Sequence, residues 1–177
     1  EKVMEKILII VDMQKDFIDG TLGTKEAQEI VPAVKEKIEN FDGEIIFTLD
    51  THTEEYMDTQ EGRNLPIPHC IKGTPGHEIA EELQPYTKKA LAIFEKGTFG
   101  SRKLASFLKE LHKEKEIESI ELIGLCTDIC VVSNALLIKA FLPEVPIIVD
   151  SSCCAGVTPK KHESALETMR SCQIEVK

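Results

Sequence analysis

The chain has 177 residues, of which 42% are hydrophobic and 29% are charged, a composition typical of one soluble globular domain over residues 1–177. Its 21 basic and 31 acidic residues give a net charge of −10, which argues against nucleic acid or an anionic membrane as a partner. No apolar run approaches the ~20 residues of a membrane span and no apolar leader opens the chain, so we expect a cytoplasmic protein.

Strand and helix signals alternate along the chain. Apolar runs rich in β-branched residues predict six strands, at residues 7–11, 44–49, 91–94, 119–124, 145–149 and 174–176. Helix signals lie between them, beginning near Val31-Pro32 and then covering residues 77–83, 101–111, 128–141 and a stretch from Thr158 onward. Residues 51–76 are expected to form a long polar loop. The alternation predicts a doubly wound three-layer α/β sandwich, with a six-stranded, mostly parallel sheet and helices on both faces.

Reactive side chains follow four of the predicted strands. Asp12, Asp50 and Lys96 come at or just after the strand ends, and a short turn leads from the fourth of these strands to Cys130. Because ligands bind outside the carboxyl ends of parallel strands, we expect these groups to meet in one crevice. A thiol beside a proton acceptor and a cation indicates an enzyme that cleaves amides or esters.

Cys130 lies in the segment Gly-Leu-Cys-Thr-Asp-Ile-Cys at residues 124–130, where a strand ends and an apolar helix begins. Free amides and the helix dipole at such a position lower the pKa of a thiol and can hold an oxyanion. The alternative is that Cys130 is a small core residue, as most free cysteines are. The six cysteines contain no Cys-x-x-Cys pair, so we expect reduced thiols rather than disulfides.

Asp12 and Lys96 each have an ordinary interpretation. Asp12 can be a strand-end turn former, but an acidic group directly after five apolar residues needs a partner if it is buried. Lys96 can be a solvated lysine; in a short glycine-containing loop it can instead turn into the crevice and hold Asp12 ionised.

The sequence also offers ligands for a metal ion. Asp50 and His52 are two residues apart, on one side of an extended chain, and His69 lies on a proline-stiffened loop. An aspartate with two neutral imidazoles suits zinc, iron or manganese, and Glu61 in the same loop can be a fourth ligand. The alternative is that these are ordinary loop histidines. The three other histidines, to which we assign no role, are His77, His112 and His162.

Several motifs, in the same order as in a known family, span nearly the whole chain. They are Asp-Met-Gln-Lys-Asp-Phe at residues 12–17, Asp-Thr-His at 50–52, Pro-His-Cys-Ile-Lys-Gly-Thr-Pro-Gly at 68–76, Lys-Gly at 96–97, and Gly-x-x-Thr-Asp-x-Cys at 124–130. With these motifs the chain resembles the isochorismatase-like cysteine hydrolases, and among them most closely the nicotinamidases.

The resemblance implies a role for each group of residues. Cys130, Asp12 and Lys96 would form the catalytic triad, and the backbone amides of Cys126 and Cys130 would form the oxyanion hole. A cis peptide bond is expected between Cys126 and Thr127.

The resemblance likewise implies a divalent metal, preferably zinc, on Asp50, His52 and His69. Phe17 would stack on a pyridine ring, and Gln14, in the same motif, is assigned to the substrate site. One departure is that nicotinamidases of the better-known bacterial type often have a tryptophan near the second metal histidine, where this chain has Pro66 and no tryptophan at all.

These features predict a metal-dependent amidohydrolase that converts nicotinamide to nicotinate and ammonia through a cysteine thioester. The nearest alternative keeps the fold and the triad but acts on another small amide, of the N-carbamoyl or ureidoacrylate type. A non-catalytic ligand-binding protein and a thiol redox protein are weaker alternatives, because the triad is complete and no Cys-x-x-Cys is present. The family resemblance also suggests a homo-oligomer.

Overall fold

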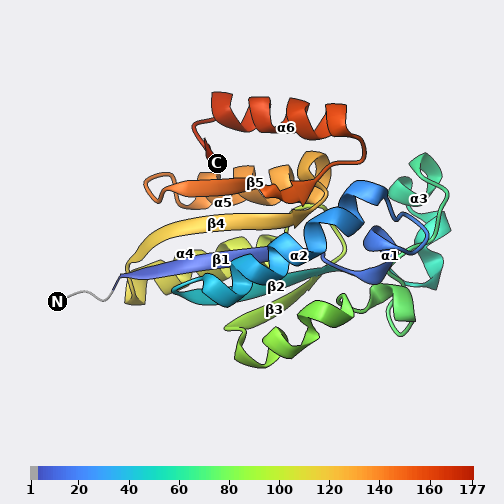
Figure 1. The fold of residues 1–177 in the computed structure, drawn as a ribbon, viewed down its shortest axis with the longest axis horizontal. Helices are drawn as coiled ribbons and strands as arrows, with labels where there is room; N and C mark the ends of the chain where they lie inside the picture. The colour runs from blue at the N-terminus through green and yellow to red at the C-terminus, as the bar shows by residue number, and fades with distance from the viewer. Residues whose placement is uncertain (1–3) are drawn as a thin grey trace.

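A computed structural model describes residues 4–177 and contains one six-stranded sheet in the order β3-β2-β1-β4-β5-β6 (Figure 1). The strands are β1 (Glu5–Val11), β2 (Glu44–Asp50), β3 (Ala92–Lys96), β4 (Ile117–Leu125), β5 (Ile147–Ala155) and β6 (Glu175–Val176). Every neighbouring pair of strands is parallel, so the predicted parallel sheet is confirmed.

Helices cover both faces of the sheet, which confirms the predicted three-layer sandwich. The α-helices are α1 (Lys15–Ile18), α2 (Lys25–Asn40), α3 (Gln60–Asn64), α4 (Arg102–Glu114), α5 (Val132–Phe141) and α6 (Pro159–Ser171). Helix α2 packs on one face, and α4, α5 and α6 contribute to the core on the other (Figure 1). Within residues 4–177, no helix is long and apolar enough to cross a membrane.

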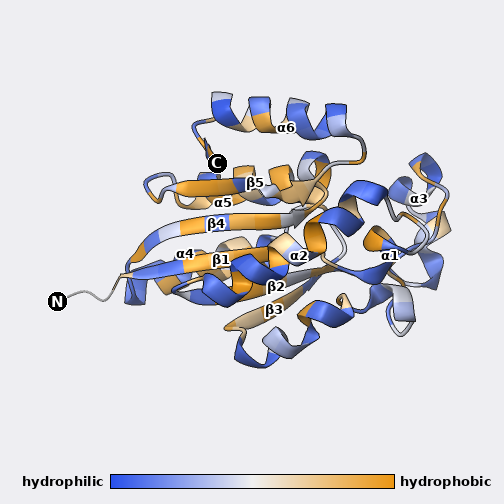
Figure 2. Ribbon diagram, in the orientation of Figure 1, coloured by the Kyte–Doolittle hydropathy of each residue, from blue (hydrophilic) through white to orange (hydrophobic). Residues whose placement is uncertain are grey.

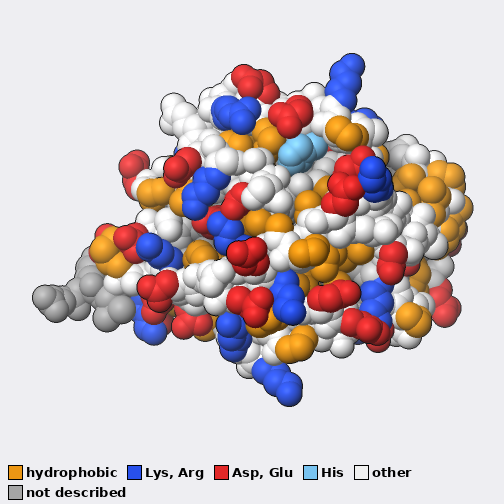
Figure 3. Space-filling view, viewed as in Figure 1, with side chains coloured by type: hydrophobic (Ala, Val, Ile, Leu, Met, Phe, Trp, Pro, Cys, Tyr) orange, Lys and Arg blue, Asp and Glu red, His pale blue; other side chains and the backbone are white. Residues whose placement is uncertain are grey.

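The central strand β1 shows why the sequence forms this sheet. Ile7, Ile9 and Val11 point into one core, whereas Leu8 and Ile10 point into the other, and all five are fully buried. A parallel strand that is buried on both faces needs such a continuous apolar run. Figure 2 shows hydrophobic residues along the strands and polar residues on the outer helix surfaces, and Figure 3 shows acidic and basic side chains interspersed on one face.

Two of the predicted helices differ from those in the structure. Helix α2 begins at Lys25, before the predicted start near Val31, because the Thr24 side chain accepts a hydrogen bond from Ala27 N and caps it there. Instead of one helix over residues 77–83, the chain forms two 3₁₀ segments, Pro75–His77 and Glu81–Lys89, and the second contains a proline.

The strands β3 and β5 run further than the sequence indicates. Strand β5 continues to Ala155 because its pairing with β4 resumes after an irregularity, with Gly124 opposite Cys154. Strand β3 continues to Lys96, which pairs with Asp50, so this lysine ends a strand and does not belong to the following loop. The predicted loop at 51–76 also contains α3 and a 3₁₀ segment at Glu54–Asp58.

Candidate active site

The structure brings Asp12, Lys96 and Cys130 together at the carboxyl edge of the sheet. Lys96 Nζ donates to Asp12 Oδ2 at 2.8 Å and to Cys130 Sγ at 3.3 Å. Asp12 is fully buried, and Lys96 and Cys130 are each only 5% exposed. Lys96 ends β3, Asp12 follows β1 and Cys130 follows β4. The parallel topology therefore brings Lys96 to Asp12, 84 positions away in the chain, and to Cys130, 34 positions away. An aspartate, a lysine and a thiol in mutual contact can transfer a proton from the thiol.

Thr48, which the sequence analysis missed, fixes the orientation of Asp12. Its hydroxyl donates to Asp12 Oδ1 at 2.7 Å, and Asp12 N donates to Thr48 O at 3.1 Å. Asp12 has a φ of 49°, a left-handed conformation that aspartate tolerates better than most residues. With Oδ1 bound to Thr48, the other carboxylate oxygen faces Lys96. Thr48 lies two residues before Asp50 on β2, and this spacing was the available signal.

The electrostatics differ from the expectation that the start of a helix lowers the thiol pKa. Burial, and then the Asp12 carboxylate, raise the pKa of Cys130 well above its ordinary value, while Lys96 acts in the opposite direction. Burial also raises the pKa of Asp12, which Lys96 opposes. A thiolate beside an ionised Asp12 would place two anions around one buried ammonium. We therefore assign a neutral thiol beside an Asp12–Lys96 ion pair.

Replacing Lys96 with alanine is expected to raise the pH at which Cys130 reacts with iodoacetamide. The lysine is the neighbouring charge that lowers the pKa of Cys130, so its loss makes the thiolate harder to form. Alkylation would be followed by peptide mass spectrometry from pH 6 to pH 10. Lys72→Ala, which removes an exposed partner of Glu95, is the matched control and should leave the profile unchanged. An unchanged profile in Lys96→Ala would place that lysine outside the thiol's environment.

Cys130 lies in a π-helical turn, Thr127–Val131, between β4 and α5. The Cys126 carbonyl accepts hydrogen bonds from Ile129 N and Val131 N, each at 3.0 Å. The cis peptide bond joins Leu125 to Cys126, so its predicted place one residue later is wrong. Leu125 is the last residue of β4, so this bond is the first one outside the strand. The oxyanion hole formed by the amides of Cys126 and Cys130 remains a prediction.

Two contacts hold this turn in place. Thr127 Oγ1 lies 2.7 Å from Nδ1 of His162 on α6, a histidine without a predicted role. Asp128 Oδ1 accepts a hydrogen bond from Val157 N at 3.0 Å.

Gly124, with a φ of 117°, lies so close to β1 that a Cβ there would be 2.2 Å from Val11 O. Only glycine allows the two strands to approach in this way.

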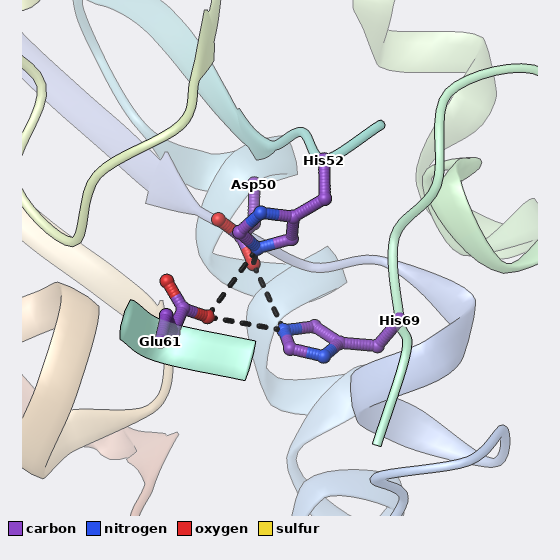
Figure 4. Close-up of side chains that lie close together, drawn as sticks. All are labelled: Asp50, His52, Glu61 and His69. Atoms are coloured by element: carbon purple, nitrogen blue, oxygen red, sulfur yellow. Dashed lines mark hydrogen bonds and ion pairs between the residues drawn. The ribbon is translucent and has the colours of Figure 1, made fainter. Parts of the chain in front are cut away.

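The four candidate metal ligands converge beside this site (Figure 4). Asp50 Oδ2 lies 3.0 Å from His52 Nε2 and 3.3 Å from His69 Nε2. Glu61 Oε2 lies 3.4 Å and 3.7 Å from the same two nitrogens, so all four ligand atoms are within 4.8 Å of one another. Two imidazoles and two carboxylates form a donor set that suits zinc, iron or manganese.

The hydrogen bond that His69 makes through Nδ1, its ring nitrogen away from the other candidate ligands, also fits a metal site. His69 Nδ1 lies 2.8 Å from Ile67 O, which places the proton on Nδ1 and leaves Nε2 as the electron-pair donor. In the neutral ring, Nε2 then faces the oxygens of Asp50 and Glu61, and a divalent cation between these acceptors would satisfy all three. The donor set therefore fits a divalent ion.

Aromatic rings surround the two histidines. The Tyr56 ring centroid lies 4.9 Å from that of His52 and 5.0 Å from that of His69, and its hydroxyl donates to Leu65 O at 2.7 Å. Phe17 lies on α1 with its ring 5.4 Å from His69, and is thus beside the candidate metal ligands. Tyr56, buried and four residues after His52, is an aromatic residue of the site that the sequence analysis missed.

The Gln14 side chain is held by backbone groups of Asp50 and His77. Its Nε2 donates to Asp50 O at 2.8 Å and to His77 O at 2.9 Å, and its Oε1 accepts from Asp50 N at 2.8 Å. The side chain is fully buried and both of its N–H groups are used. These contacts make Gln14 a residue that positions Asp50, and they leave it no free donor for a substrate.

The residues around Cys130 adjoin the candidate metal ligands. Lys96 Nζ, which contacts Cys130, lies 3.9 Å from Asp50 Oδ1. A molecule held against the candidate metal ligands would therefore be next to the thiol.

A parallel α/β sheet with a buried aspartate, lysine and cysteine at its carboxyl edge, beside four candidate metal ligands, is the arrangement expected of a cysteine hydrolase. Residues 6–176 match the isochorismatase domain model, and the chain belongs to this family. The predicted family is thus confirmed, as is the prediction of an amidohydrolase.

The similar proteins span the whole domain. The chain is 32% identical to an uncharacterized isochorismatase family protein, PncA, of Bacillus subtilis, with 92% of this chain and 93% of the relative covered. It is 27% identical to a nicotinamidase/pyrazinamidase of Mycobacterium tuberculosis, with 97% of each covered. The structure is similar to that of the pyrazinamidase of Pyrococcus horikoshii in complex with zinc, with a TM-score of 0.78, 29% identity and 98% of both chains covered.

Proposed function

We propose that this protein is a metal-dependent nicotinamidase, which hydrolyses nicotinamide to nicotinate and ammonia through a thioester on Cys130. The observation that carries the proposal is that the thiol adjoins the candidate metal ligands: Lys96 Nζ is 3.3 Å from the Cys130 sulfur and 3.9 Å from Asp50 Oδ1. A substrate that places a carboxamide at the thiol and a ring nitrogen at the metal ligands matches this arrangement. Relatives and solved structures named nicotinamidase or pyrazinamidase support it.

The triad residues would act in two stages. In the first, Asp12 takes the thiol proton while the Cys130 sulfur attacks the carboxamide carbon. The C–N bond then breaks, the acyl group stays on sulfur, and Asp12 returns the proton to the departing ammonia. In the second, Asp12 takes a proton from water as the water oxygen attacks the thioester carbon. The C–S bond then breaks, Asp12 returns that proton to the Cys130 sulfur, and nicotinate leaves as the remaining proton passes to solvent. Lys96 stabilises the negative charge as it moves between Asp12 and Cys130.

Asp50, His52 and His69 would hold the metal ion, with Glu61 as the fourth ligand. When bound, the metal supplies a Lewis-acid contact for the pyridine nitrogen, which orients the ring. Zinc is our first choice, since the similar pyrazinamidase of P. horikoshii was solved in complex with zinc, and iron or manganese would suit the same donors. Phe17 packs beside His69 and would form one wall of the ring site.

Removal of the metal is expected to abolish hydrolysis of nicotinamide, and zinc, iron or manganese should restore it. Benzamide, which lacks the ring nitrogen, should be a poorer substrate for the metal-loaded enzyme by roughly tens- to a thousandfold, because the directed contact is lost. Cys130 should remain alkylatable in the stripped protein. Ammonia release from both amides, before and after chelation, measures these effects.

His52→Ala provides the control for this experiment. It removes one metal ligand and should narrow the difference between nicotinamide and benzamide, because it removes the feature that distinguishes them. Equal rates on both amides, in a protein that elemental analysis shows to lack stoichiometric metal, would contradict the nicotinamidase proposal. That outcome would favour an N-carbamoyl or ureidoacrylate-type amide as the substrate.

A further inference from the structure

Asn134 joins the two segments of chain that carry Lys96 and Cys130. It lies on α5, one turn after Cys130, and its side chain is fully buried. Nδ2 donates to Cys130 O at 2.8 Å and to Phe99 O at 3.2 Å, and Oδ1 accepts from Ser101 N at 2.8 Å. All the hydrogen bonds of this amide thus go to backbone groups, two of them in the segment after β3 and one in the turn that carries the thiol.

The segment after β3 contacts Lys96 directly. Lys96 Nζ donates to Thr98 O at 3.1 Å, in addition to its contacts with Asp12 and Cys130. Thr98 is exposed and Phe99 is 46% exposed, so burial of side chains does little to hold this loop. A Cβ on Gly100 would be 3.3 Å from Ser133 O, which shows how closely the loop approaches α5.

These contacts form a closed ring. It runs from the Cys130 carbonyl through the Asn134 amide to Phe99, then by Thr98 O to the Lys96 ammonium and back to the Cys130 sulfur. Within this ring, the Asn134 side chain links the Cys130 turn to the loop. We propose that Asn134 is a positioning residue that sets the distance between the Lys96 ammonium and the Cys130 sulfur. The inference deepens the proposed function, because it concerns how the nucleophile of that reaction is held.

Two substitutions separate this role from simple support of the helix. In Asn134→Ser the short hydroxyl can still bond back to the Cys130 carbonyl, one turn earlier, but cannot reach Phe99 or Ser101. Asn134→Leu removes all three hydrogen bonds without adding charge. Ile138→Val, a buried change one turn further along α5, is the matched control, because it should lower the melting temperature and removes none of these hydrogen bonds.

The main measurement is the pH profile of Cys130 alkylation in the absence of substrate, well below the melting temperature of each variant. We expect both Asn134 variants to shift the profile to higher pH, as Lys96→Ala does but by less, and Ile138→Val to leave it in place. The kcat for nicotinamide should fall about 10- to 100-fold with little change in KM. In a Lys96→Ala background, Asn134→Ser should cause no further shift, because the residue acts through the lysine.

An alkylation profile of Asn134→Ser that coincides with that of the wild type would overturn the proposal. So would a shift of undiminished size in the Lys96→Ala background. The profile requires no substrate, so its outcome is independent of whether nicotinamide is hydrolysed. Failure of this inference is therefore distinguishable from failure of the proposed function.

Discussion

Replacing Cys130 with alanine is expected to abolish ammonia release from nicotinamide, with a fall in kcat of at least ~10⁴-fold. The proposed reaction passes through a bond to sulfur, and neither Asp12 nor Lys96 can provide a nucleophile in its place. The fold should remain, because alanine is well tolerated in a helical turn and only one buried sulfur atom is lost. Steady-state ammonia release and circular dichroism of the same preparation measure both effects.

The other cysteines provide controls for that experiment. Cys126→Ala, Cys153→Ala and Cys172→Ala should each retain most of the activity, since no hydrogen bond joins any of these thiols to Lys96 or Asp12 within residues 4–177. Burial raises the pKa of Cys126 to about 12 and raises that of Cys130 as well, so the contact with Lys96, and not the pKa, distinguishes Cys130. If Cys130→Ala turns over at a rate near that of the wild type, the assignment of the nucleophile is wrong.

The fold was predictable where local sequence and burial agree. Strand β1 is buried on both faces, and its continuous apolar run identifies it without reference to the rest of the chain. The start of α2 was not predictable in this way, because its first turns are polar and the Pro32 signal suggests a later start. The true signal is the Thr24 cap, which is one residue in a polar stretch. The end of β5 depends on pairing with β4, which no local pattern encodes.

The same distinction between local and long-range signals applies to the residues of the candidate site. Asp12, Lys96 and Cys130 were predictable because parallel strands place their carboxyl ends at one edge, so position along each strand was sufficient. Thr48, Asn134 and the actual contacts of Gln14 were not, because their hydrogen bonds join residues that are far apart in the chain or belong to backbone groups. The pKa of Cys130 also depends on burial, which outweighs the helix-end effect that the sequence suggested.

Replacing Asp12 with asparagine is expected to lower the rate of ammonia release by roughly 10²–10⁴-fold, the contribution of a general base. The asparagine oxygen can still accept the Thr48 hydrogen bond, so the side chain keeps its orientation. It cannot, however, take the thiol proton or return it to ammonia. Thermal melting of the variant is the control for the fold, because the substitution leaves the buried Lys96 without its anionic partner.

The same variant should make Cys130 easier to ionise. The Asp12 carboxylate raises the pKa of Cys130, so its loss lowers that pKa and leaves Lys96 free to pair with the thiolate. Alkylation by iodoacetamide should therefore shift to lower pH in Asp12→Asn, opposite to the shift in Lys96→Ala, although hydrolysis becomes slower. A more reactive thiol in a slower enzyme is the signature of a lost proton carrier, because distortion of the site would impair both reactions. If the alkylation profile shifts in the same direction in both variants, Asp12 and Lys96 do not have opposite effects on the pKa of Cys130.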